Sequence, residues 1–117
     1  MDLETFLQTD WHDAPLEAFR LGQEGLALEA LLWNEELDHY DCWLIRFDAF
    51  EKIEVKVEGT LNLKELDDLE IFTMDVEPDE NGHVTGEIEI LPSNTGWWTF
   101  KVYRARVTVE SGGVRKY

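Results

Sequence analysis

Histidines next to carboxylates are the first residues whose types could support chemistry. His12 and His39 each lie between two aspartates, whereas His83 follows Gly82 in a turn. Neighbouring carboxylates can raise the pKa of an imidazole or complete a metal site. Neither cluster has the His-x-x-x-His or Cys-x-x-Cys spacing that is typical of zinc. We therefore interpret these histidines as solvated loop residues and expect no metal and no cofactor.

Residues 77–82 read Glu-Pro-Asp-Glu-Asn-Gly and resemble the first half of a calcium-binding loop. A complete loop needs a glutamate six residues after the glycine, and that position is Ile88. The segments on either side alternate like strands, whereas a calcium loop of this kind joins two helices. The pattern therefore predicts a plain hairpin turn.

Cys42 is the one cysteine, so an internal disulfide is excluded. His39 is near in sequence and could act as a base for a catalytic thiol. The neighbouring aspartates 38, 41 and 48 make the local field acidic, which raises a thiol pKa and suppresses the reactive thiolate. We expect an inert, buried cysteine and a reducing, cytoplasmic location, since the acidic N-terminus also lacks the pattern of a signal peptide.

The charge is strongly acidic and unevenly distributed. The 117 residues contain 26 acidic and 10 basic side chains, a formal net charge of −16 at pH 7. Residues 1–96 hold 25 of the acids and five of the bases, and residues 97–117 hold one acid and five bases. Nucleic acid and anionic membrane surfaces would be repelled, whereas a basic protein would be attracted. Simple solubility is the alternative explanation of this charge.

The elements that must position these residues are mostly strands, because apolar residues alternate along several segments. The predicted strands are residues 16–21, 26–33, 43–57, 69–76, 84–91 and 96–110, with a short helix at 2–8. The composition of 26–33 also allows a helix, and 43–57 could be one long strand or two that meet near Glu51. We predict a polar loop at 34–41, a helical turn or irregular loop at 61–68, and a frayed tail at 111–117.

Two of these strands change phase. In 96–110 the apolar residues lie on one face up to Val102 and on the other face from Tyr103 onward. A second phase shift falls between Ile71 and Phe72. A strand that exchanges its buried face contains a bulge or a sharp bend. We therefore predict a single β-rich domain, 1–117, with six to seven strands in a curved antiparallel sheet, as a sandwich or half-open barrel.

Residues 11–15, WHDAP, followed by a short strand, a turn and a leucine-rich strand, resemble a group of small bacterial β-rich proteins. In that group a Trp/His-Asp pair precedes the first hairpin, and a later strand is similar to residues 44–50, LIRFDAF. Many members have no known function, and some are similar to immunity proteins, which bind and neutralise a toxin. The resemblance implies structural roles for His12 and Asp13 and supplies no catalytic residue.

Tryptophans next to carboxylates are the best candidates for binding a partner, because exposed aromatics are frequent anchors at interfaces. Of the adjacent pair Trp97 and Trp98, one must point outward, and we expect that it is Trp97. The predicted partner-binding residues are Trp33, Glu35, Glu36, Asp38, Asp41, Trp43, Asp79, Glu80 and Trp97.

The sequence thus predicts a non-enzymatic, immunity-like module that captures a basic protein. Two alternatives stay open. One is a half-barrel that binds a small ligand in a cavity lined by the odd-numbered aromatics of residues 43–57, and the other is a hydrolase-type enzyme that uses carboxylates. Pairing of an exposed strand edge with a second copy is compatible with all three.

Overall fold

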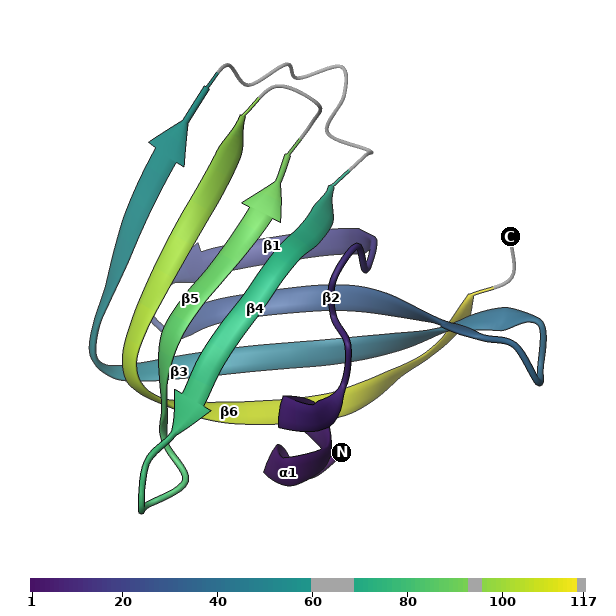
Figure 1. The fold of residues 1–117 in the computed structure, drawn as a ribbon, viewed down its shortest axis with the longest axis horizontal. Helices are drawn as coiled ribbons and strands as arrows, with labels where there is room; N and C mark the ends of the chain where they lie inside the picture. Colours follow the sequence, from purple (N-terminus) through teal and green to yellow (C-terminus); the bar gives the residue numbers. More distant parts are fainter. Residues whose placement is uncertain (60–68, 93–95, 116–117) are drawn as a thin grey trace.

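The computed structural model describes residues 1–59, 69–92 and 96–115. It is mostly β, with one short helix and a curled antiparallel sheet that forms a half-barrel, as predicted (Figure 1). The elements are α1 (Leu3–Gln8), β1 (Leu16–Gly22), β2 (Gly25–Asn34), β3 (His39–Glu58), β4 (Glu70–Pro78), β5 (Val84–Leu91) and β6 (Trp97–Arg115). The strand order is β1-β2-β3-β6-β5-β4.

The two long strands β3 and β6 run through the whole sheet and bend together (Figure 1). Their register is interrupted between Ala49 and Lys52, opposite Ala105 and Tyr103. Arg104 there takes the left-handed backbone conformation, with φ of 52°. A bulge of this kind adds a residue and sharpens the local twist. The first half of β3 therefore lies between β2 and the second half of β6, whereas its second half pairs with the first half of β6, beyond which lie β5 and β4.

The two ends of the strand order meet at one corner of the half-barrel. Pro15 and Glu70 form an isolated antiparallel bridge. The amide of Leu16 donates to the carbonyl of Leu69 at 2.9 Å, and that of Ile71 donates to the carbonyl of Ala14 at 2.9 Å. These bonds join the connector before β1 to the start of β4.

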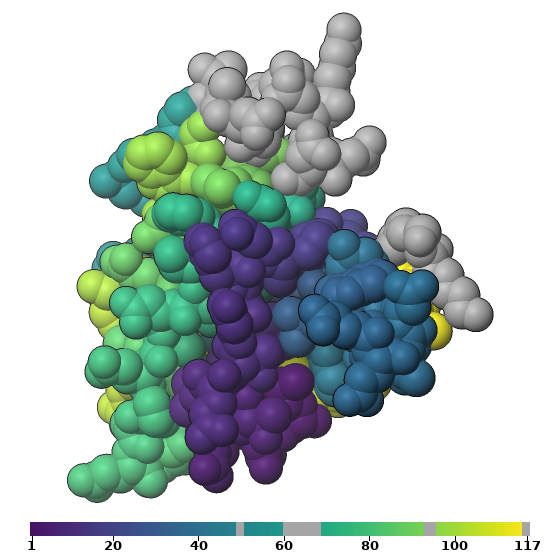
Figure 2. Space-filling view, turned by 45° about the vertical axis from the view of Figure 1, so that its right-hand side comes forward, coloured from purple at the N-terminus to yellow at the C-terminus, as the bar shows by residue number. Residues whose placement is uncertain are grey.

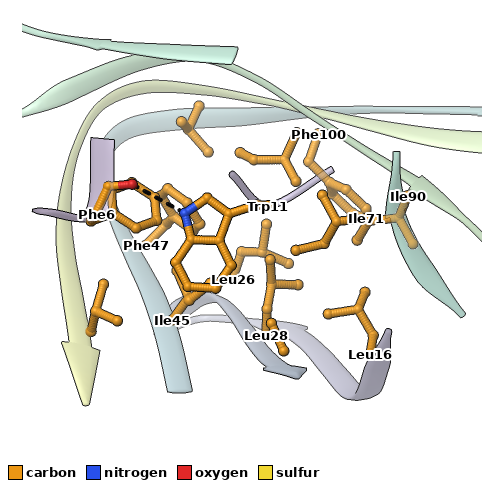
Figure 3. Close-up of a cluster of buried hydrophobic side chains, with 14 of the residues drawn as sticks. Phe6, Trp11, Leu16, Leu26, Leu28, Ile45, Phe47, Ile71, Ile90 and Phe100 are labelled. Carbon is orange, nitrogen blue, oxygen red and sulfur yellow. Dashed lines mark hydrogen bonds between the residues drawn. The ribbon is translucent and has the colours of Figure 1, made fainter. Parts of the chain in front are cut away.

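The core fills the inside of the curled sheet (Figure 3). Its fully buried residues come from strands on both sides of the bend, among them Leu26, Leu28, Ile45, Phe47, Ile71, Val84, Ile88, Ile90, Phe100 and Val102. The ligand-binding alternative needs a cavity between residues 43–57, yet Ile45 and Phe47 are packed into this core.

The helix α1 covers one end of the core with aromatic side chains. Phe6 and Trp11 are both buried, with ring centroids 5.7 Å apart, and Phe6 lies 6.2 Å from the ring of Phe47. Trp11 Nε1–H donates to the Phe6 carbonyl at 3.1 Å (Figure 3). A helix of six residues is not stable alone. The cap by Asp2, whose carboxylate accepts from the Thr5 amide at 2.8 Å, and this aromatic packing hold it in place.

Several predicted boundaries are confirmed and others are wrong. Residues 26–33 are strand, residues 43–57 belong to one long strand, and β4 has its register shift between Ile71 and Thr73. The predicted loop 34–41 is only a four-residue turn, because β2 reaches Asn34 and β3 begins at His39. The tail is not frayed up to Arg115, since β6 pairs there with Tyr40. The segment 61–68, which was predicted as a helical turn or irregular loop, lies outside the described residues.

No helix in the described ranges is long and apolar enough to cross a membrane.

Candidate functional site

The β2–β3 hairpin carries most of the predicted binding residues, and it extends past the body of the molecule (Figure 1). Its strands pair without interruption from Leu26 and Phe47 out to Asn34 and His39. The turn needs one residue with positive φ, and Asp38 supplies it at 53°. Aspartate tolerates this conformation better than most residues with a side chain. The turn is therefore tight although it has no glycine.

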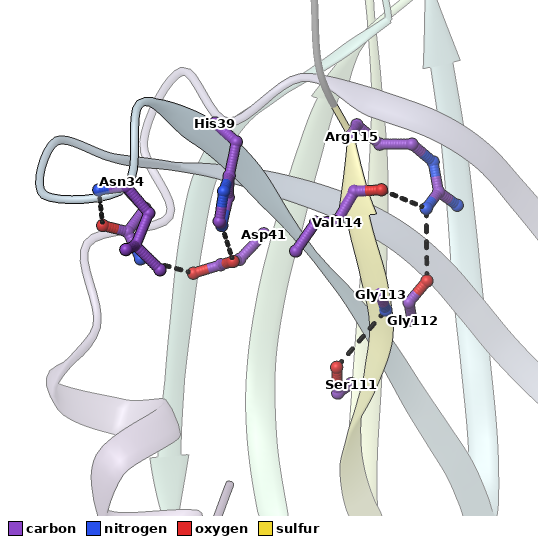
Figure 4. Close-up of polar contacts among 9 residues, drawn as sticks. Asn34, His39, Asp41, Ser111, Gly112, Gly113, Val114 and Arg115 are labelled. Carbon is purple, nitrogen blue, oxygen red and sulfur yellow. Dashed lines mark hydrogen bonds and ion pairs between the residues drawn. The ribbon is translucent and has the colours of Figure 1, made fainter.

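A polar cluster at the base of the turn fixes its shape (Figure 4). Asn34 accepts from the amide of Leu37 at 3.2 Å, and its Nδ2 donates to Asp41 Oδ2 at 3.2 Å. Asp41 Oδ1 lies 2.9 Å from His39 Nε2. His39 and Asp41 thus bond to each other along β3, and Asp41 also joins β3 to Asn34 of β2.

The outer face of the hairpin carries an aromatic pair, in which Trp33 is exposed and Tyr40 is half-buried. Trp33 and Tyr40 face each other across the two strands, with ring centroids 5.0 Å apart and planes at 69°. Trp33 remains 48% exposed, and Leu37 in the turn is 64% exposed. Cross-strand aromatic pairs stabilise a hairpin. We call the surface formed by Trp33, Glu35, Glu36, Leu37, Asp38 and Tyr40 the tip surface.

The structure brings together only part of the predicted binding residues. Trp33 and the exposed carboxylates of Glu35, Glu36 and Asp38 share the tip surface. Asp41 belongs to the polar cluster, and Trp43 packs against the core instead of standing exposed.

The remaining predicted residues lie elsewhere. Asp79 and Glu80 are at the β4–β5 turn, at a different end of the molecule from the tip surface (Figures 1 and 2). Trp97, 44% exposed as expected, lies opposite Glu58 at the start of β6. Asp79 Oδ1 accepts from the amides of Asn81 and His83 at 2.8 and 3.0 Å, which explains the calcium-like residues as a hairpin turn.

The prediction did not include Leu37 and Tyr40. The signal for Tyr40 was its position, because a four-residue turn at 35–38 places it opposite Trp33. Taking 34–41 as one loop hid this pairing.

Cys42 is buried, as predicted, but the acidic field is not the main cause of the raised pKa of its thiol. Burial is the largest cause that raises the pKa of its thiol, with smaller contributions from Glu17 and Glu29 and an opposing one from Arg115. A thiol in this position is neutral and shielded from solvent.

His12 ties the N-terminal connector to β4. Its Nδ1 bonds to the Phe72 carbonyl, its Nε2 lies 3.3 Å from Asp13 Oδ2, and the Asp13 amide donates to the Ile71 carbonyl at 2.8 Å. The bond to Phe72 is the largest cause that raises the pKa of His12, and the nearby carboxylates of Asp13, Asp10 and Glu70 add to it.

This raised pKa predicts a pH-dependent stability. The folded state binds a proton on His12 more tightly than the unfolded chain does, so the stabilisation is complete below pH 6.5 and is lost as the pH rises through the folded-state pKa. Chemical denaturation of wild type and His12→Gln should show a stability difference at pH 6 that shrinks by pH 8. An NMR titration with a His12 midpoint at or below 6.5 would contradict this prediction.

Open pockets of about 310 and 300 Å³ lie around the β1–β2 hairpin, and a groove of about 80 Å³ crosses the outer face of β1, β2, β3 and β6. Within residues 1–59, 69–92 and 96–115, no three His, Cys, Asp or Glu side chains are grouped to hold a metal.

Comparisons with protein-family models, with curated proteins and with solved structures found no match to this chain.

Proposed function

We propose that this protein is a non-enzymatic binding module that captures a basic protein through the tip surface. The observation that carries the proposal is the exposed Trp33, held by Tyr40 on a protruding hairpin and surrounded by carboxylates. An aromatic anchor beside charges of one sign is a common arrangement at protein interfaces.

The charge distribution supports the choice of a basic partner. The arginines of β6 are neutralised in place, because Arg104, Arg106 and Arg115 form ion pairs with Glu51, Asp48 and Glu17 at 3.3, 3.0 and 2.9 Å. In contrast, none of the ion pairs in the described part of the chain involves Glu35, Glu36 or Asp38. The carboxylates of the tip surface therefore keep their full attraction for a cationic partner.

The rigidity of the hairpin supports tight binding. The polar cluster of Asn34, His39 and Asp41 and the Trp33–Tyr40 pair already order the tip surface in the free protein. A preorganised surface loses little conformational entropy when a partner binds. Carboxylates at the rim would accelerate association, and Trp33 would slow dissociation.

The resemblance of residues 11–15 and 44–50 to immunity-like proteins suggests the class of partner. We propose a basic toxin that the module neutralises by covering its surface. The filled core and the ordered tip surface favour binding over the two alternatives, since neither needs such a hairpin.

Affinity capture followed by kinetics tests the proposal. We compare wild type with a tip variant, Glu35→Gln, Glu36→Gln and Asp38→Asn, and with a matched control, Asp75→Asn, Glu77→Gln and Glu80→Gln, at the β4–β5 hairpin. Both variants remove three exposed carboxylates. A basic protein captured by wild type and the control should bind the tip variant about tenfold more slowly at low salt.

Trp33→Ala should mainly raise the dissociation rate of that protein, since it removes the apolar anchor. If the tip variant and the control lose association rate equally, then the net charge of the whole molecule sets this rate. That result would refute the assignment of the tip surface. Capture of no basic protein at low or high salt would leave solubility as the explanation of the acidity.

A further inference from the structure

Within the described part of the chain, the second half of β3 is an edge of the sheet. Residues 52–58 pair with β6 on one side, from Lys52 opposite Tyr103 to Glu58 opposite Trp97. On the other side, the pairing of β3 with β2 ends at Phe47, and no strand of the described residues continues it. Figure 1 shows this half of β3 at the left margin of the sheet, with β6, β5 and β4 all on its other side.

This edge exposes valines on the inner face of the sheet. Val55 is 47% exposed and Val57 is 60% exposed, although their neighbours across β6, Phe100 and Trp98, face the same side. An opening of about 300 Å³ lies beside Val55, between the end of the β1–β2 hairpin and Ile53. A free edge with exposed apolar residues is a template for another strand.

The outer face of the same edge alternates in charge. Lys52, Glu54, Lys56 and Glu58 follow at every second position, and each lysine pairs with the glutamate two residues on, at 3.1 and 2.7 Å. In an antiparallel pair, residues directly opposite each other point to the same face. Two copies that pair around Val55 would set Lys52 opposite Glu58 and Glu54 opposite Lys56, each contact occurring twice.

This register is favoured over its neighbours. The inner positions become Val55 opposite Val55 and Ile53 opposite Val57, all apolar. A shift of the partner by two residues in either direction sets lysine against lysine and glutamate against glutamate. A shift by one residue sets valine against glutamate or lysine. The segment 52–58 is therefore complementary to itself in one antiparallel alignment.

We propose that β3 residues 52–58 form a homodimer interface, in which a second copy of this chain adds its own edge strand antiparallel around a two-fold axis at Val55. The proposal is independent of the tip surface, which lies on a different hairpin. Because each copy carries a net charge of −16, long-range repulsion opposes association, and we expect a Kd between about 1 μM and 1 mM at physiological salt.

Charge reversals at positions 54 and 56 test the alignment by sedimentation equilibrium. Glu54→Lys sets lysine against Lys56 twice, and Lys56→Glu sets glutamate against Glu54 twice. Each single variant should dimerise about 10- to 30-fold more weakly than wild type. The double variant, Glu54→Lys with Lys56→Glu, should recover the wild-type Kd. An equimolar mixture of the two single variants should form a heterodimer, because their charges are then complementary.

Net charge alone predicts a different result. Glu54→Lys makes the chain less acidic and would then strengthen association, whereas Lys56→Glu would weaken it. That outcome, or a wild type that stays monomeric up to about 1 mM, would overturn the proposal. Hydrogen exchange gives a second measurement, since amides in residues 52–58 should become protected as the concentration rises. Dimerisation without this protection would place the interface elsewhere and would also overturn it.

Discussion

Replacing Trp11 by alanine is expected to lower the free energy of unfolding by about 3–5 kcal/mol. The indole is buried against Phe6, and its Nε1–H bonds to the Phe6 carbonyl at 3.1 Å. Truncation would leave a cavity where α1 covers the core and would free the six-residue helix from the sheet. Urea denaturation, followed by circular dichroism, measures the loss.

Two further variants separate packing from a general effect of losing tryptophan. Trp97→Ala removes an indole that is 44% exposed, and it should cost about 1 kcal/mol or less. Trp11→Phe keeps most of the apolar contact but removes the hydrogen bond, so an intermediate loss of about 1–2 kcal/mol is expected. If Trp11→Ala and Trp97→Ala cost the same, then α1 contributes little to the stability of the half-barrel.

The curved sheet could be predicted because the apolar residues that alternate in the sequence are the ones that alternate between the two faces of the folded strands. Val102 and Ala105 are both buried although they are three residues apart, which two-residue alternation forbids in a regular strand. The change of phase in the sequence was therefore a direct sign of the bulge at Arg104, where β6 bends. The bulge could be recognised in the sequence because it shifts every later apolar side chain by one position.

Contacts between distant residues could not be read in the same way. The glycines and polar residues after Glu110 suggested a frayed end, yet β6 continues to Arg115. Its last residues pair with the start of β3, and the Arg115 guanidinium bonds to Glu17, 98 positions away in sequence. Local propensity carries no information on such partners, and tertiary pairing overrides it here.

The sequence predicted the residue types of the candidate site but not their three-dimensional arrangement. Acidic residues between two tryptophans identified the region, but the turn at 35–38 was hidden because Asp38 takes the positive φ that usually indicates glycine. Without that turn, neither the pairing of Trp33 with Tyr40 nor the exposure of Leu37 followed from the sequence. The separation of Asp79 and Glu80 from the tip surface also required the three-dimensional structure (Figure 1).

The close approach of the β1–β2 hairpin to the bend of β3 predicts the second large effect. Gly25 has a φ of 107°, and a Cβ atom added to it would lie 2.0 Å from the Phe47 carbonyl oxygen. Gly25→Ala therefore combines an unfavourable backbone conformation with a clash against backbone that cannot rotate away. We expect a loss of about 3 kcal/mol or more in the free energy of unfolding, measured by urea denaturation.

Gly22 supplies a matched control in the same hairpin, since it pairs with Gly25 across β1 and β2. A Cβ atom added to Gly22 would meet no atom within 4 Å, so Gly22→Ala should change the stability by about 0.5 kcal/mol or less. Because both variants add one methyl group to the same turn, only the contact with Phe47 and the backbone conformation distinguish them. Equal stability of the two variants would mean that the hairpin can separate from the bend of β3 without loss, and that the half-barrel does not depend on this contact.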